Sequence, residues 1–316
     1  MFSVWLDNPL MLPVLVPILA GFLCLLVPRR GAPLRSLVAV LASAMTLVFA
    51  WQAFGLGEAT YAPLGWLPLR LDALSGLVLL AIALFGFLVA LYSAGYMKGR
   101  DRHREYFTYL LWTLGVSCAA VLANDLVMLL VCWGFLGLLL FLMVGIAGPG
   151  AASAARKSLM IIGASDAILL LGIAIYWQLA GSMTVSGAGS GLVVSGPLAH
   201  AAFLCFLVGA LAKTGAVPVH SWVPDCGEKA DAPVSAYLPA SLDKLLGIYL
   251  LARCLLDLFE PTPAMLFLLM LIGAVTILGM SLGALVQHDL KRLLSYTAVG
   301  QVGYIILGVA SGTAVG

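Results

Sequence analysis

Ten apolar runs, most of them about 20 residues long, follow one another along this chain of 316 residues. They cover 9–27, 36–56, 73–97, 106–123, 126–147, 158–180, 198–217, 232–256, 264–286 and 293–316. A run of this length can cross the hydrocarbon core of a bilayer as an α-helix, because a helix satisfies its own backbone hydrogen bonds there. The sequence therefore predicts an all-α fold, a polytopic bundle of about ten transmembrane helices.

The composition excludes a water-soluble domain, because 63% of the residues are hydrophobic and only 9% are charged. A soluble domain has about a quarter of its residues charged. The first run is followed by Arg29 and Arg30 and has no basic segment before it, so we expect a retained helix and not a signal peptide. The basic residues stand in short loops, a pattern that does not favour nucleic acid as a partner.

Basic residues occur in every second predicted loop. On one side lie twelve of them: Arg29, Arg30, Arg35, Lys98, Arg100, Arg102, Arg104, Arg156, Lys157, Lys229, Lys291 and Arg292. The opposite side keeps only Arg70 and, at a helix end, Arg253. Since cytoplasmic loops carry the excess of Lys and Arg, this pattern predicts a cytoplasmic location for the twelve and an N-terminus outside.

The six cysteines form no C-x-x-C pair, and five of them lie in apolar runs, as small buried side chains do. The sequence also contains no signature of haem, iron–sulfur, dinucleotide or P-loop binding. We therefore expect neither a metal nor a cofactor in this chain, and no redox centre of its own.

Apart from Arg253 at a helix end, four charged residues fall inside the apolar runs: Asp166, Lys213, Asp243 and Lys244. A charge at the centre of a span costs about 2.5–3.5 kcal/mol on insertion scales, so it is rare without a partner or a function. Asp243 and Lys244 point about 100° apart on a helix, so each needs a partner on another helix or in internal water. Four charges on three neighbouring spans favour a buried polar path.

Simpler readings exist for two of these residues taken alone. Asp166 comes early in its run and would pair with Lys157 or Arg156 near the cytoplasmic interface. Lys213 is near the end of its run and would extend its ammonium group to the lipid headgroups. These readings stay open on the sequence alone.

Prolines accompany the charges. Pro218 and Pro224 interrupt the seventh run, and Pro233 and Pro239 lie early in the eighth. Broken helices persist in a membrane where protein or trapped water satisfies the freed backbone groups, as in ion transporters. His220 stands beside the break, and a histidine side chain has an ordinary pKa of about 6.5. A lysine, a histidine and nearby acids suit a proton relay better than covalent catalysis.

Four segments resemble one known family, the antiporter-like proton-translocating subunits of respiratory complex I, membrane-bound hydrogenases and multisubunit cation/proton antiporters. The segment "AKTGAVPVHSWVPDCGEKADAPVSA" resembles the family's seventh-to-eighth helix signature. "AARKSLMIIGASDAILLLG" is similar to its sixth helix, "NDLVMLLVCWGFLGLLLFLMVG" to its fifth, and "HDLKRLLSYTAVGQVGYIILG" to its ninth and tenth. The similarity runs in order over the whole chain.

The resemblance implies roles for particular residues. Lys213 would be the central lysine of a proton half-channel at a broken seventh helix, with His220 after it and Asp166 as a nearby sixth-helix acid. Lys291 would stand at the cytoplasmic start of the tenth helix. Lys244, beside Asp243, matches a basic position of the eighth helix less closely.

The resemblance also implies an organisation and a setting. The chain would comprise N-terminal helices (1–105), a proton-channel repeat (106–256) and the start of a second, inverted repeat (257–316). Its partners would be other membrane subunits, through them a soluble redox arm, and lipid, in a bacterial or archaeal plasma membrane.

Two departures from the family pattern stand out. Family members carry a glutamate directly after the fifth-helix tryptophan, whereas here Trp133 is followed by Gly134. Either Asp166 or Asp243 takes over its role, or the channel is altered or lost. The second departure is length: the chain stops where the second repeat begins, so we expect a fragment or a half-unit that needs a partner.

Three functions remain open on this reading. The leading one is ion translocation, of protons or of sodium, within a redox-driven complex. The second is a subunit of a cation/proton antiporter, and the third is a structural subunit whose channel is disabled.

Overall fold

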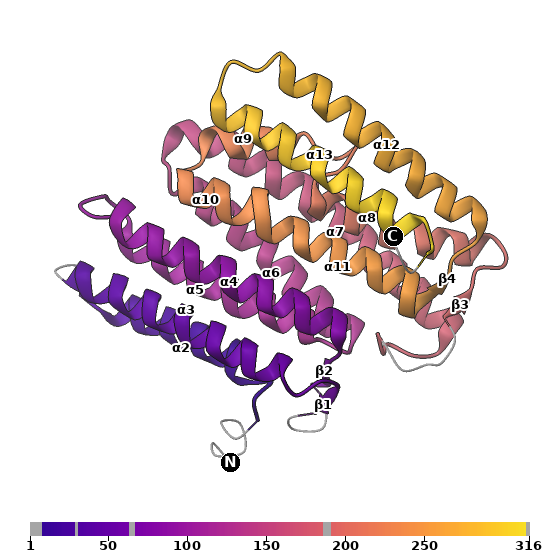
Figure 1. Cartoon of the computed structure of the whole chain (residues 1–316), viewed down its shortest axis with the longest axis horizontal. Helices are drawn as coiled ribbons and strands as arrows, with labels where there is room; N and C mark the ends of the chain where they lie inside the picture. The colour runs from indigo at the N-terminus through magenta and orange to yellow at the C-terminus, as the bar shows by residue number, and fades with distance from the viewer. Residues whose placement is uncertain (1–7, 29–30, 63–66, 186–190, 314–316) are drawn as a thin grey trace.

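The computed structural model describes residues 8–28, 31–62, 67–185 and 191–313, and its helices run side by side in one bundle (Figure 1). Among these residues, eight helices are long and apolar enough to cross a membrane. They are α3 (Ala32–Phe54), α4 (Ala73–Tyr96), α5 (His103–Leu122), α6 (Leu126–Gly145), α7 (Ala152–Ala180), α8 (Pro197–Thr214), α12 (Pro263–Leu285) and α13 (Leu290–Ala310). The predicted all-α bundle is confirmed.

Shorter helices complete the bundle. They are α2 (Leu12–Leu26), α9 (Trp222–Lys229), α10 (Ala232–Tyr237) and α11 (Asp243–Arg253). A short 3₁₀ turn (Pro149–Ala151) precedes α7, and π-helical segments occupy Leu238–Leu242 and Cys254–Leu258. Each of the ten predicted runs contains a helix. The inverted relation between the repeats and the three-part division of the chain stay predictions.

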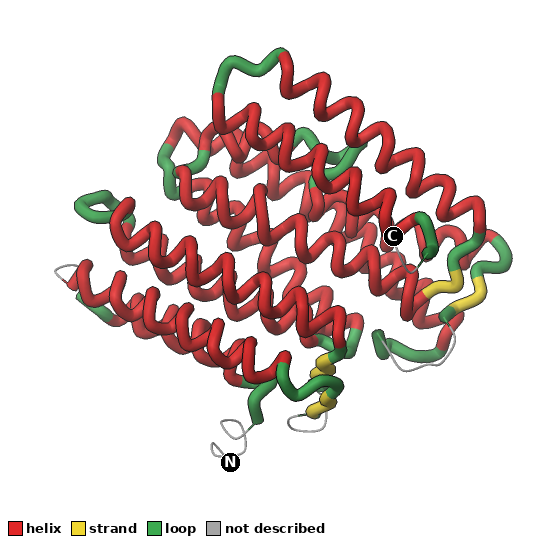
Figure 2. The backbone as a smooth tube through the Cα atoms, in the orientation of Figure 1, coloured by secondary structure: helices red, strands yellow, loops and turns green. Residues whose placement is uncertain are grey.

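Strands occur only at loop level in the described residues, as the tube in Figure 2 shows. β1 (Ala59–Tyr61) pairs antiparallel with β2 (Leu69–Leu71), with Thr60 opposite Arg70. β3 (Leu192–Val193), in the connection between α7 and α8, pairs in parallel with β4 (Phe259–Glu260).

The layers follow chain order. α2 and α3 form one edge, α4 to α6 come next, α7, α8, α10 and α11 follow, and α12 packs on α13 at the other edge (Figure 1). In the most apolar 18-residue stretch of α5, 83% of the residues are buried, against 28% in that of α12, so α5 is a central helix and α12 a peripheral one.

Polar caps set several helix starts, because the first backbone N–H groups of a helix have no partner within it. Asp72 accepts from the Ser75 amide at 2.9 Å before α4, and Asp125 accepts from the Val127 amide at 2.9 Å before α6. Asp289 accepts from the Arg292 amide at 2.8 Å before α13.

The basic loops gather at one end of the bundle, where the α4–α5, α6–α7, α9–α10 and α12–α13 connections lie (Figure 1). Contacts join them: Arg100 pairs with Asp231 at 3.3 Å, and Arg102 donates to the Gly145 carbonyl at 2.9 Å. Arg29 and Arg30 fall outside the described residues. This end is the predicted cytoplasmic side.

Three boundaries differ from the prediction. α7 begins at Ala152 and not at residue 158, so the helix already includes Arg156 and Lys157. Asp166 therefore lies near the middle of its helix and not near the start. The eighth run is not one helix, since Pro239 lacks the N–H that an α-helical bond needs and lies in the π-helical segment Leu238–Leu242.

The seventh run ends at Thr214 and not at residue 217, because Gly215 closes α8 with φ +69°, a left-handed conformation that glycine adopts freely. Pro218 lies in the following break. Pro224 does not interrupt a helix as predicted, because it is in the first turn of α9, where an N–H has no helical partner to lose.

Candidate functional site

Lys213 is enclosed by protein at the last turn of α8, with none of its surface exposed. Its Nζ donates to the Trp133 carbonyl of α6 at 3.4 Å and lies 5.3 Å from the centre of the Trp133 ring. A lysine at this point also faces the partial negative charge of a helix C-terminus. The side chain does not extend to the headgroups, so that reading is excluded.

Asp243 is the nearest acid to Lys213. Its Oδ1 lies 3.6 Å from Lys213 Nζ, and 1% of its side chain is exposed. Neither carboxylate oxygen has a hydrogen-bond partner among the described residues. Burial of two charges is costly unless good geometry repays it, and 3.6 Å is longer than a hydrogen bond. The attraction between the two side chains is therefore weaker than in a hydrogen-bonded ion pair, and it changes when the Nζ–Oδ1 distance changes by a small amount.

Lys244 also contacts the C-terminal end of α8. Its Nζ donates to the Thr214 carbonyl at 3.1 Å, one of the carbonyls left free where α8 stops. The first two residues of α11 thus contact the last two residues of α8, charge to charge and charge to backbone. Of the two alternatives that the sequence leaves for Asp243 and Lys244, a partner on another helix or internal water, the structure shows partners on α8 for both.

Gly247 makes this close approach of α11 to α8 possible. A Cβ at Gly247 would lie 2.7 Å from the Ala210 carbonyl oxygen and 2.7 Å from the Thr214 amide nitrogen. Real Cβ atoms do not come this near to backbone atoms, so a larger residue would push α11 away and open the Lys213–Asp243 pair.

Asp166 projects from α7 toward α6, and it is not in ion-pair contact with Lys213. Its Oδ1 is buried without a hydrogen-bond partner, and its Oδ2 would be 3.6 Å from a Cβ at Gly137. Lys157, the alternative partner, pairs with Asp225 at 2.7 Å instead. Within the described part of the chain, Asp166 makes no ion pair shorter than 4.0 Å, whereas Asp243 does.

Gly134 stands where the resemblance expects a glutamate. The residue is exposed on the outer face of α6, and a Cβ added there meets no atom within 4 Å. The position therefore has room for a longer side chain. Trp133, the residue before it, is buried.

His220 lies in the break between α8 and α9, and its Nδ1 is buried without a partner in the described residues. The break is held on both sides. The Trp222 indole donates to the Ala212 carbonyl of α8 at 3.0 Å, and the Val223 amide donates to the His220 carbonyl at 3.0 Å. A buried ring nitrogen next to a broken helix suits proton exchange with water.

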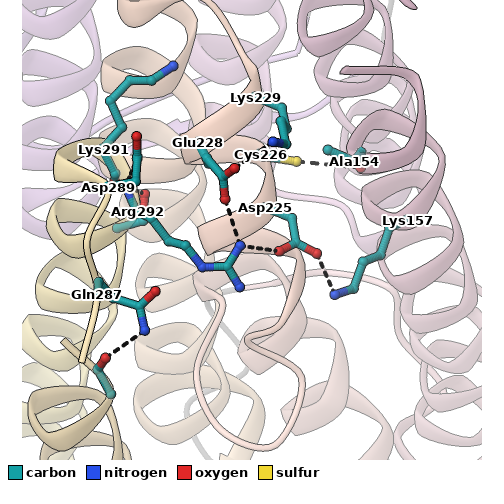
Figure 3. A network of polar contacts seen from close by, with 12 residues as sticks. Ala154, Lys157, Asp225, Cys226, Glu228, Lys229, Gln287, Asp289, Lys291 and Arg292 are labelled. Carbon is teal, nitrogen blue, oxygen red and sulfur yellow. Dashed lines mark hydrogen bonds and ion pairs between the residues drawn. The ribbon is translucent and has the colours of Figure 1, made fainter. Parts of the chain in front are cut away.

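A polar network fixes α9 at the end of the bundle that carries the basic loops (Figure 3). Asp225 accepts from Lys157 of α7 at 2.7 Å and from Arg292 of α13 at 3.1 Å. Arg292 also pairs with Glu228 at 2.7 Å. Hydrogen bonds from Lys229 and Arg292 hold the pKa of Glu228 below its ordinary value, so it stays a carboxylate at neutral pH.

Lys291 contributes to the same end by donating to the Ala230 carbonyl at 2.7 Å. Sequence reasoning missed Asp225 and Glu228. Their position between Pro224 and Lys229, on a charged segment between two apolar runs, was a signal for a polar short helix.

A second buried network closes the opposite end of α11. Arg253 pairs with Asp72 at 2.7 Å and with Asp257 at 2.8 Å, and its Nε donates to the Tyr249 hydroxyl at 3.0 Å. The Tyr249 hydroxyl donates to the Val121 carbonyl of α5 at 2.7 Å. Sequence reasoning treated Arg253 only as a charge at a helix end.

Metal coordination is not evident in the described residues, where no group of three or more His, Cys, Asp or Glu side chains could hold an ion. All six cysteines are free thiols.

Two family models match the sequence. The model described as "NADH:quinone oxidoreductase/Mrp antiporter, TM" matches residues 123–316. The model described as "NADH-Ubiquinone oxidoreductase (complex I), chain 5 N-terminus" matches residues 67–107.

Curated relatives agree with these matches. NADH-quinone oxidoreductase subunit L of Escherichia coli is 30% identical over 326 residues, covering 96% of this chain and 52% of the relative. The chloroplastic NAD(P)H-quinone oxidoreductase subunit 5 of Lemna minor is 32% identical over 255 residues, covering 77% of this chain and 33% of the relative. The chain thus spans about half of the length of the first of these relatives and about a third of the second.

Solved structures share the fold. A chain of the Mrp complex from Dietzia sp. superposes with a TM-score of 0.85 at 25% identity, covering 97% of this chain and 34% of that one. A chain of an archaeal membrane-bound sulfane sulfur reductase superposes with a TM-score of 0.84 at 21% identity, covering 95% and 64%. A chain of respiratory complex I from Thermus thermophilus gives 0.80 at 22%, covering 97% and 65%.

Proposed function

Because the chain belongs to the NADH:quinone oxidoreductase/Mrp antiporter transmembrane family, we propose that it moves protons across a membrane as one subunit of a redox-driven complex. The observation that carries this proposal is the buried Lys213–Asp243 pair between a broken helix and a π-interrupted one. Ionisable residues inside a membrane bundle, at discontinuous helices, are typical of ion pathways.

The proposed chemistry is a proton transfer within the pair. When Lys213 gives a proton to Asp243, a buried ion pair becomes a buried neutral pair. The two states are closer in free energy here than in water, because a low dielectric penalises both charges. A movement of α11 against α8 changes the 3.6 Å separation and so selects one state.

The remaining site residues extend this pair in two directions. His220, in the break, would exchange protons between Lys213 and the end of the bundle with the basic loops. Lys244 would hold α11 to the end of α8 and receive the proton on its way out. Asp166 would add a second carboxylate beside the path without contacting the lysine.

The partner subunits, the membrane and the orientation of the chain in it are part of the same proposal. Other membrane subunits of the complex would be the direct partners, and a soluble redox arm on other chains would supply the electrons. The membrane would be a bacterial or archaeal plasma membrane with the N-terminus outside. The alternating placement of basic loops supports this orientation.

A cation/proton antiporter is the second candidate, because the similarity to the Dietzia Mrp chain covers 97% of this chain with a TM-score of 0.85. Purified complexes in liposomes with an internal pH dye separate the two functions. Proton movement that starts only with an electron donor supports the redox-driven complex, whereas exchange driven by a sodium gradient alone supports the antiporter. In a structural subunit with a disabled channel, Lys213→Met would change neither.

A further inference from the structure

A cavity of about 420 Å³ opens beside the α4–α5 connection, away from the buried charge pair. Residues 99–105 and the first turn of α3 line it. It lies at the end of the bundle that carries the basic loops. Exposed apolar side chains begin within the same turn of α3, with Leu34 and Leu37, so the cavity is at the depth where hydrocarbon gives way to headgroups.

The lining is rich in arginine. Four line it, Arg35, Arg100, Arg102 and Arg104, against the two carboxylates of Asp101 and Glu105. Arg100 also pairs with Asp231 at 3.3 Å, and the cavity keeps a positive excess even when that acid is counted. Such an excess in a recess at the membrane surface attracts anions.

The guanidinium groups hold defined positions. Arg35 forms a buried floor, donating to the Pro28 carbonyl at 2.9 Å and lying 3.1 Å from His103 Nδ1. Arg102 has φ +59°, an uncommon backbone conformation for arginine, and its Nη1 donates to the Gly145 carbonyl at 2.9 Å. Arg104 approaches Glu105 only to 3.9 Å, beyond hydrogen-bond distance.

Each guanidinium carries five N–H donors in a planar fork, and these contacts engage only part of them on Arg102 and Arg104. Arginine forks bind phosphate oxygens in pairs. We propose that this cavity binds a phosphate group at the membrane surface, carried by an anionic phospholipid headgroup or by a free phosphate ion. The proposal is independent of the ion path.

The test uses the protein purified with its partner subunits in detergent. The probes are dihexanoyl phosphatidylglycerol, dihexanoyl phosphatidylcholine and inorganic phosphate, and the readout is the rise of the melting temperature with probe concentration. The variant is Arg102→Gln/Arg104→Gln. The control is Arg156→Gln, an exposed arginine of α7 that does not line the cavity.

Phosphatidylglycerol should raise the melting temperature of the wild type and of Arg156→Gln. In the double variant its apparent affinity should fall about tenfold or more, since charged hydrogen bonds are lost. A response to phosphatidylglycerol stronger than to inorganic phosphate identifies a lipid, and a response to inorganic phosphate that equals or exceeds the response to phosphatidylglycerol identifies free phosphate. An unchanged response in Arg102→Gln/Arg104→Gln, or an equal response to phosphatidylcholine, overturns the proposal. Arg104→Gln alone provides the check if the double variant misfolds.

Discussion

Lys213 Nζ lies 3.6 Å from Asp243 Oδ1, and both side chains are enclosed by protein at the meeting point of α8 and α11. Asp243 is therefore the acid that faces Lys213 where the fifth-helix glutamate of the family is absent. Asp166, the other candidate, lies against Gly137 of α6 and makes no ion pair with Lys213 within 4.0 Å.

The pair should behave as a unit in stability measurements. Lys213→Met or Asp243→Asn should each lower the free energy of unfolding by about 3 kcal/mol, because each leaves one buried group without its partner. Lys213→Met/Asp243→Asn should cost clearly less than the sum of the two. Thermal denaturation of the purified complex measures this, and strictly additive losses would show that the two side chains do not interact.

The contact of α11 with α8 should depend on the missing side chain at Gly247. Gly247→Ala should destabilise the protein by about 1–3 kcal/mol and slow ion movement, because its Cβ would collide with the backbone of α8. Gly279→Ala is the matched control, since a Cβ at that exposed helical glycine meets nothing within 4 Å. Equal melting temperatures for both variants would contradict the close approach.

Arg253 should anchor the opposite end of α11. Arg253→Gln should cost about 3 kcal/mol of unfolding free energy, because Asp72 and Tyr249 lose a buried partner. Arg70→Gln, on a half-buried pair at 3.8 Å, should cost less than about 1 kcal/mol. Similar losses would mean that the buried network adds no stability.

Asp72 should make the stability of the Arg253 network, at the C-terminal end of α11, depend on pH in the acid range. Burial raises its pKa, but hydrogen bonds from the Ser75 amide and Arg253 outweigh burial and leave the pKa below its ordinary value of 3.8. Stability from this carboxylate is therefore complete above pH 3.8 and is lost as the pH falls through the lower, folded-state pKa. The fall of the melting temperature in acid should be shallower in Asp72→Asn, and parallel curves would exclude this role.

Gly134 offers a gain-of-function test. Gly134→Glu is sterically allowed, because a Cβ at this position meets no atom within 4 Å, but the variant should be less stable than the wild type because its carboxyl group lies on the exposed face of a membrane-spanning helix. The variant places a carboxyl group one residue from the Trp133 carbonyl that Lys213 contacts. In the Asp243→Asn background it should restore part of the ion movement, whereas Gly134→Gln should not. Equal rates for Gly134→Glu and Gly134→Gln would show that a second acid cannot take the role of Asp243.

The spans and the buried charges could be predicted because they depend on length and polarity alone. Apolar runs located the helices of the described residues except the polar α9 (Trp222–Lys229), and the charges inside those runs singled out Lys213, Asp243 and Lys244 as candidate site residues. The family resemblance, which the family models confirm, predicted Lys213 as the central lysine and Lys244 as a less closely matching basic residue.

What the sequence did not show depends on backbone detail and on distance. The early end of α8 follows from the left-handed Gly215, and the π-helical segment before Asp243 contains Pro239. The choice of Asp243 over Asp166 needed the packing of α11 on α8, which rests on the small size of Gly247.

The most direct test compares Asp243→Asn with Asp166→Asn in the complete complex, reconstituted in liposomes with an internal pH dye. Asp243→Asn should slow proton movement at least about tenfold, as Lys213→Met should, because the acceptor of the lysine proton is gone. Asp166→Asn should retain most of the wild-type rate. Normal proton movement in Asp243→Asn, together with a severe loss in Asp166→Asn, would contradict the assignment of the pair as the switch.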